Sequence, residues 1–211
     1  RLMIRKFREE MALALKGTAY WKSMAFMAFC CEPMLANYRL YQHEYKRGNF
    51  LALREALNVL WDSALLESPT PYSNQAFRNV YSQNPPGWKT REMSELEHVA
   101  CDTSAAIAYS MEYGAEGVED VCDAALWTIL SGLGLDPALP YSDLPQPARD
   151  LLQQEIQRQR ICLDRIMAAS DSSKAETIFL LRQEGAAARP SILPTAAIEF
   201  SAALIDEEGV K

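Results

Sequence analysis

The chain has 211 residues, of which 49% are hydrophobic and 23% charged, and this is the profile of a globular protein long enough to bury a core. Its formal net charge of −7 argues against a nucleic-acid partner, and no apolar run approaches the roughly 20 residues of a membrane span. Five cysteines without a C-x-x-C spacing argue against a zinc or thioredoxin-type motif and predict reduced, buried thiols in the cytoplasm.

Apolar residues recur at helical spacing along nearly the whole chain, and no stretch alternates as a half-buried strand does. With cap and breaker residues as boundaries, this spacing predicts helices at 2–15, 19–32, 34–45, 50–66, 76–81, 94–113, 117–133, 148–169, 173–185 and 195–207. Thr18 and Asn49 are predicted N-caps, and Pro147 is expected at a helix start. The prediction is an all-α fold, one domain over residues 1–211, with eight to ten helices built as αα-hairpins.

Two stretches break the helical pattern. Residues 68–92 are rich in Pro, Ser and Asn, and 136–147 form a Pro-rich linker. The first is the longest irregular region, so it is the best sequence candidate for an exposed functional loop, although a plain connection is the simpler interpretation.

The helix expected at 19–32 is apolar nearly all round, which is typical of a central, buried helix. The helix at 34–45 carries tyrosines at 38, 41 and 45, and the helix at 50–66 carries Trp61. We therefore expect one aromatic-rich cluster that contains Trp21, Phe26, Met27, Phe29, Tyr38 and Trp61.

The same region carries a family resemblance. The residues concerned are Trp21, Phe26, Met27, Ala28, Cys31, Glu32, Asn37, Tyr38, Trp61 and Asp62. In this order and spacing they resemble the YjaG-like bacterial proteins, domain of unknown function 416. The likeness runs roughly from Tyr20 to Leu193, and the tail from Thr195 departs from it. The resemblance implies an all-helical, cytosolic, oligomeric protein and implies no activity.

Two constellations are compatible with metal chemistry. Glu95 and His98 form the Glu-x-x-His spacing of di-iron bundles, with Asp102 one turn further on, but no second Glu-x-x-His exists. A histidine on a helix face that pairs with Asp102 is the simpler interpretation. The acids Glu92, Glu95, Glu116, Glu119, Asp120 and Asp123 have spacings like those with which all-α nucleotide pyrophosphohydrolases hold Mg²⁺. Such pairs also arise by chance on acidic helices, so no catalytic residue, metal or cofactor is predicted.

The predicted helix 148–169 has an apolar stripe, interrupted by Gln159, and a dense polar face. Gln154, Gln157, Arg158 and Arg160 on that face are candidate interface residues, in a homodimer or with another protein, unless the helix is simply solvated. The leading hypothesis is a non-catalytic protein-interaction module, and its acidic charge would also suit an inhibitor of a basic protein. The alternatives are a Mg²⁺-dependent nucleotide pyrophosphohydrolase and a binder of small ligands in an aromatic core pocket.

Overall fold

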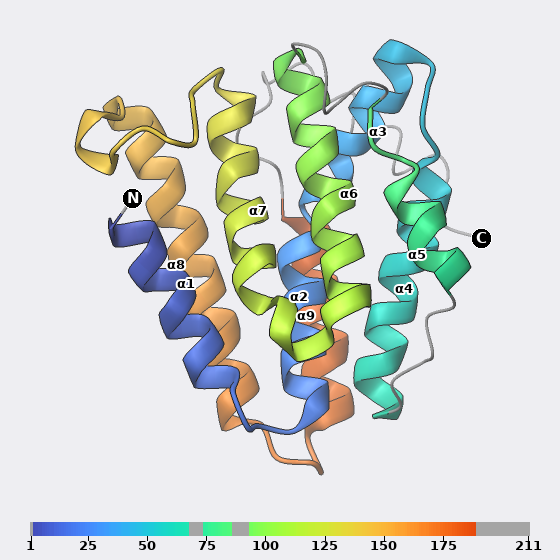
Figure 1. Cartoon of the computed structure of the whole chain (residues 1–211). Helices are drawn as coiled ribbons and strands as arrows, with labels where there is room; N and C mark the ends of the chain where they lie inside the picture. The colour runs from blue at the N-terminus through green and yellow to red at the C-terminus, as the bar shows by residue number, and fades with distance from the viewer. Residues whose placement is uncertain (1, 68–73, 86–92, 189–211) are drawn as a thin grey trace.

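The computed structural model describes residues 2–67, 74–85 and 93–188, and over these the chain folds into α-helices and short 3₁₀ helices, with no strand (Figure 1). The elements are α1 (Leu2–Leu15), α2 (Tyr20–Cys31), α3 (Met34–Tyr45), α4 (Phe50–Leu66), α5 (Asn74–Tyr81), α6 (Glu95–Tyr113), η1 (Gly114–Gly117), α7 (Val118–Gly132), η2 (Tyr141–Asp143), α8 (Gln146–Ala168) and α9 (Lys174–Ala187). The all-α prediction is confirmed. The predicted helix 195–207 and most of the irregular stretch 68–92 lie outside the described residues.

Local sequence explains most helix ends. Asn49 caps α4 by accepting a hydrogen bond from the Ala52 amide, and Ser94 forms a capping box with Glu97 at the start of α6. Pro147 lies in the first turn of α8, as expected. The predicted cap at Thr18 is wrong. The Thr18 hydroxyl donates instead to the Leu15 carbonyl at the end of α1, and Ala19 precedes α2 without a side-chain cap.

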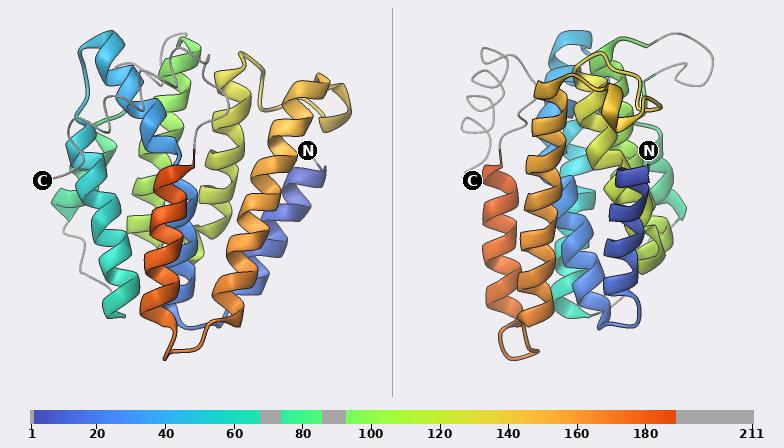
Figure 2. Two further views of the ribbon diagram at one scale, coloured as in Figure 1. Left: turned by 180° about the vertical axis from the view of Figure 1, so that it is seen from behind. Right: turned by 90° about the vertical axis from the view of Figure 1, so that its left-hand side faces the viewer.

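Helix α2 is the centre of the fold. It contacts α4, α6, α7, α8 and α9, and every one of its residues except Tyr20 and Lys22 is buried. Figure 1 shows α6 and α7 in front of it, and the view from behind in Figure 2 shows α9 covering its other side. The predicted cluster is confirmed, because Trp21, Phe26, Met27, Phe29, Tyr38 and Trp61 all belong to the one hydrophobic core. Burial of each such aromatic side chain is worth about 3–5 kcal/mol relative to alanine.

Helices α1, α8 and α9 lie along one side of the molecule, as the right-hand view of Figure 2 shows. Helix α1 packs much more extensively on α7 than on α8. It is held to α7 by Arg8, which donates to Asp123 and lies 3.7 Å from Glu119. Space remains between α1 and α8. No helix in the described part of the chain has the length and hydropathy needed to span a membrane.

Candidate functional site

A buried polar centre lies at the C-terminal end of α2. The Glu32 side chain is fully enclosed, and one guanidinium nitrogen of Arg54 donates to both of its carboxylate oxygens, at 3.0 and 2.9 Å. The indole nitrogen of Trp61 donates to the same carboxylate at 2.8 Å. Helix α9 closes the site, because a Cβ at Gly185 would lie only 3.0 Å from the Glu32 Cβ. Glu32 therefore joins α2 to α4 and has no open face toward a substrate.

Helix α8 contributes a second enclosed ion pair. Arg158 donates to both oxygens of Glu155 at 2.7 Å and to the Phe29 carbonyl at 3.2 Å, and its guanidinium lies 4.3 Å from the centre of the Phe29 ring. Burial alone would lower the pKa of Arg158, but the Glu155 carboxylate outweighs burial and holds that pKa above its usual value. Gln159 is fully buried and donates to Glu155 at 2.7 Å. Gln159 therefore interrupts the apolar seam inside the chain's own core.

The cysteines do not resemble nucleophiles. Cys30, Cys31, Cys122 and Cys162 are buried and unbonded to one another, and Cys101 is half-buried. Burial raises the pKa of Cys31 to about 12, and it also raises the pKa of Cys30, Cys122 and Cys162. A thiol with a raised pKa is largely protonated at neutral pH and reacts slowly. These side chains therefore serve packing.

The predicted acid pairs are divided between structural and surface positions. Asp123 is buried and engaged by Arg8, and Glu119 lies beside the same arginine. Burial raises the pKa of Asp123, with the Arg8 charge opposing that shift. Glu116 and Asp120 are exposed, and Glu92 lies outside the described residues. Asp123, a buried acid that the hydrolase hypothesis would use, therefore holds α1 against α7.

Glu95, His98 and Asp102 do not form a metal site. His98 and Glu95 are exposed, whereas Asp102 accepts a hydrogen bond from Ser131 of α7 at 3.3 Å. Burial raises the pKa of Asp102 to about 7, against the opposing effect of the Ser131 hydroxyl. Within the described ranges, no three His, Cys, Asp or Glu side chains converge closely enough to hold a metal ion. The expected contact of Asp102 with His98 is replaced by a contact between helices.

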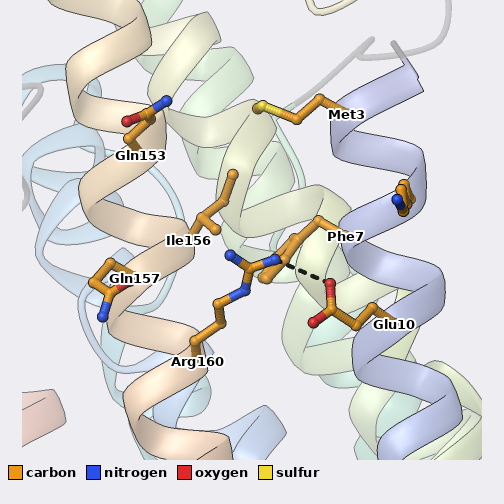
Figure 3. Close-up of a pocket in the computed structure, with 8 residues that line it drawn as sticks. Met3, Phe7, Glu10, Gln153, Ile156, Gln157 and Arg160 are labelled. Carbon is orange, nitrogen blue, oxygen red and sulfur yellow. Dashed lines mark hydrogen bonds and ion pairs between the residues drawn. The ribbon is translucent and has the colours of Figure 1, made fainter.

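An open groove of about 360 Å³ lies between α1 and α8, which run in the same direction (Figure 3). Its floor is apolar and consists of Phe7 and Ile156, both buried. Arg160 crosses the groove, donating to Glu10 at 3.0 Å with its guanidinium 5.6 Å from the centre of the Phe7 ring. The remaining lining residues are Met3, Lys6, Gln153 and Gln157. This combination of an apolar floor and polar rims suits binding, and it contains no nucleophile or acid pair for catalysis.

The four candidate interface residues separate into two groups. Gln154, Gln157 and Arg160 are exposed, and the last two line the groove. Arg158 faces inward, against α2, and takes part in the ion pair described above. The interface prediction for α8 stays a prediction, and Arg158, whose side chain is 20% exposed, is engaged within the chain itself.

Three residues with structural importance carried no clear sequence signal. Arg8 and Arg54 each neutralise a buried acid more than 20 positions away, and Gly185 gives α9 its close approach to α2. An arginine on an amphipathic helix looks the same in sequence whether its partner is water or a distant carboxylate. Gly185 was expected to end its helix, but α9 continues to Ala187 and the glycine lies inside it.

The ten residues of the family resemblance are mostly core residues. Trp21, Phe26, Met27, Ala28, Cys31, Glu32, Asn37, Tyr38 and Trp61 are buried, and Asp62 is exposed. Together with the fold, they place the chain among all-α proteins, and in this chain the helices pack around one buried helix, α2, with the Glu32 carboxylate at its end. In the part of the chain that the structure describes, these residues contribute mainly to the core.

The family follows from direct comparison. The model of the family described as "Protein of unknown function (DUF416)" matches residues 10–192, so the chain belongs to the DUF416 family. The resemblance seen in the sequence is thereby confirmed. A crystal structure of a DUF416 family protein from Shewanella baltica OS155 is 16% identical, has a TM-score of 0.50 and matches over 95% of each chain, which supports the fold. No curated protein matches the chain.

Proposed function

We propose that this DUF416 protein is a non-catalytic interaction module that binds a helical segment of another protein in the α1–α8 groove. The observation that carries the proposal is the groove itself, an open channel with an apolar floor between two helices. Grooves of this kind accept the apolar face of an amphipathic helix, whose side chains at i, i+3, i+4 and i+7 contact the floor.

The rims indicate what the partner helix would carry. Its apolar side chains would cover Phe7 and Ile156, and an acidic side chain would face Lys6, which is exposed at one rim. Further apolar contact area is available on the exposed surfaces of α1, α8 and α9. Large apolar side chains that are at least 42% exposed there are Leu13, Ile161, Met167, Phe179 and Leu180.

The other hypotheses receive less support. Asp123, which a hydrolase would need, is engaged by Arg8, and the aromatic side chains of Trp21, Tyr38 and Trp61 are buried in the core. Binding to a basic target relies on the net charge of −7, whereas the groove presents Lys6 and Arg160 against the single acid Glu10. The competing occupant of the groove is a second copy of this chain, in a homodimer. Repulsion between two copies of like net charge opposes such a dimer. The buried cysteines, which form no disulfide, support our proposal that the protein works in the reducing cytoplasm.

Site-specific photo-crosslinking in the native cell tests the proposal. A photoreactive residue at Gln157 is expected to capture one defined protein, and the same residue at exposed Asp62 on α4 is the matched control. A synthetic helix from the captured protein is then titrated against the purified chain. Lys6→Glu should weaken that binding by about tenfold, the loss expected for one charge-assisted contact, whereas Lys16→Glu just beyond α1 should not.

Two results would contradict this proposal. If the crosslinks from positions 157 and 62 capture the same proteins, the groove has no selectivity. If the crosslink joins two copies of this chain and light scattering reports a dimer, the occupant is a second copy and the hetero-partner proposal is wrong.

A further inference from the structure

A second open groove lies between α8 and α9, on the other side of α8 from the α1–α8 groove (Figure 2). It has a volume of about 400 Å³, and its apolar lining comes from Ala168, Ala169, Leu180 and Leu181. Helix α9 packs extensively on α2 and α4 but touches α8 at only a few positions. In the part of the chain that the structure describes, no helix covers the outer edge between α8 and α9.

Two large apolar side chains along this groove are left open to water. Leu180 is 46% exposed, and Ile161, which lies four positions before Arg165 on the same face of α8, is 43% exposed. Arg165 and Glu184 pair with each other from opposite walls, so neither supplies a free charge. The groove therefore offers an occupant apolar surface rather than charge.

The sequence that follows α9 has a matching apolar pattern. Residues 195–207, which lie beyond the described ranges, are predicted from their sequence to form a helix. Helical spacing puts its large apolar residues on one side and its polar ones on the other; the apolar ones are Ile198, Phe200, Leu204 and Ile205, and the polar ones are Thr195, Glu199 and Asp206. An isolated helix of about 13 residues is marginal in water, so this segment gains stability by covering its apolar side.

The connection from α9 decides where such a helix would lie. Helix α9 ends at Ala187, about one turn past Glu184, which lines the groove. Residues 188–194 separate it from the predicted helix, and connections of about two to eight residues join antiparallel neighbours in helix bundles. At 1.5 Å per residue the predicted helix would be about 20 Å long, and α9 is about 21 Å long. An antiparallel helix would therefore extend along the whole of α9.

We propose that residues 195–207 form a helix that docks antiparallel to α9 in the α8–α9 groove of the same chain. Its apolar side covers Leu180 and Ile161, and its polar side faces solvent. A second copy of this chain is the competing occupant, but the short connection supplies the chain's own segment at a high effective concentration. The inference does not depend on the α1–α8 groove. It assigns Ile161 and Leu180 to the chain itself and leaves the other exposed apolar side chains to a partner.

Hydrogen exchange of the full chain, followed by mass spectrometry at two protein concentrations, tests the proposal. We expect the amides of residues 195–207 to exchange at least about tenfold more slowly than in an isolated peptide of the same sequence, and equally at both concentrations. Exchange as fast as in the peptide would show that the segment is not docked. If protection increases with protein concentration, the occupant is a second copy and the intramolecular proposal is wrong.

Two variants at neighbouring positions of α9 give the control. Leu180→Asp and Phe179→Asp each replace an exposed apolar side chain with an acid, but only Leu180 lines the groove. The first should speed exchange in residues 195–207 about tenfold and the second less than about twofold, while α2 stays protected in both. In the segment itself, Leu204→Asp should act like Leu180→Asp, whereas Ala202→Asp, on the polar side, should not. Equal effects of Leu180→Asp and Phe179→Asp would overturn the proposal.

Discussion

The end of α2 and the α1–α8 groove both contain a glutamate–arginine pair, in opposite surroundings. Glu32 is completely enclosed and receives three hydrogen bonds from Arg54 and Trp61, whereas the Glu10 and Arg160 side chains are 52% and 46% exposed. An enclosed pair cannot lose one partner without leaving a desolvated charge, while water replaces either partner of an exposed pair. The comparison separates residues that hold the fold from residues that remain accessible to another molecule.

The largest expected effect is at Glu32. Glu32→Ala leaves the Arg54 charge and the Trp61 N–H without their acceptor, so we expect a loss of about 3–5 kcal/mol in the free energy of unfolding. Urea denaturation followed by Trp fluorescence would measure it. Glu32→Gln keeps an acceptor for Trp61 and should lose less. If Glu32→Ala costs under 1 kcal/mol, as expected for the exposed Glu9→Ala control, the contrast between the two regions does not hold.

The next effect is at the contact of α1 with α7. Arg8→Met keeps the apolar stem but leaves buried Asp123 without its cation, which should cost about 2–3 kcal/mol. Adding Asp123→Asn should recover part of that loss, because the neutral amide tolerates burial better. A double-mutant cycle measures this coupling. Additive losses in the two single variants would show that the pair is not coupled.

A smaller and pH-dependent effect is expected at Asp102. Its folded pKa of about 7 lies above the ordinary carboxyl value of 3.8 expected in the unfolded chain, so between these values the folded chain retains a proton that the unfolded chain has lost. The stabilisation from this group is complete below about pH 4 and is lost as the pH rises through about 7. Asp102→Asn should reduce the change in the free energy of unfolding between about pH 4 and pH 7. It should also raise the melting temperature at pH 8, by about 2–4 °C for each kcal/mol recovered.

The matched control for that experiment is Asp164→Asn, at an exposed position of α8. Melting curves between pH 4 and pH 8 should retain the wild-type slope in this variant. An unchanged slope in Asp102→Asn would show that the Asp102 carboxyl is solvated and titrates normally.

The smallest effect on stability is expected in the groove. Arg160→Gln breaks an exposed pair and should change the free energy of unfolding by less than about 0.5 kcal/mol. The same change should weaken binding of the partner helix, because Arg160 crosses the groove. A large stability loss in this variant would make Arg160 a structural residue like Arg158.

Sequence reasoning succeeded where a local pattern was sufficient. The bounds of α1, α3 and α4 agree with their predicted ranges, because breakers and caps such as Gly48 and Asn49 act on neighbouring residues. It was less successful for charged side chains. Arg158 and Arg160 lie two positions apart on α8, yet one is enclosed against Phe29 and the other lies in the groove. Helical periodicity alone did not separate them, because the apolar stripe of α8 is interrupted by Gln159.

The sequence alone determined the all-α class, the central place of α2, the aromatic core and the family, since each follows from apolar spacing or from residues close together in the chain. The tertiary structure alone decided the partner of each carboxyl group: Arg54 for Glu32, Arg8 for Asp123, and the Ser131 hydroxyl of α7 for Asp102. It also decided that α1 and α8 stand apart and that α8 and α9 flank a second open groove. The physical reason is that a charge interacts over a few ångströms in space, and the packing of helices sets those distances independently of separation along the chain.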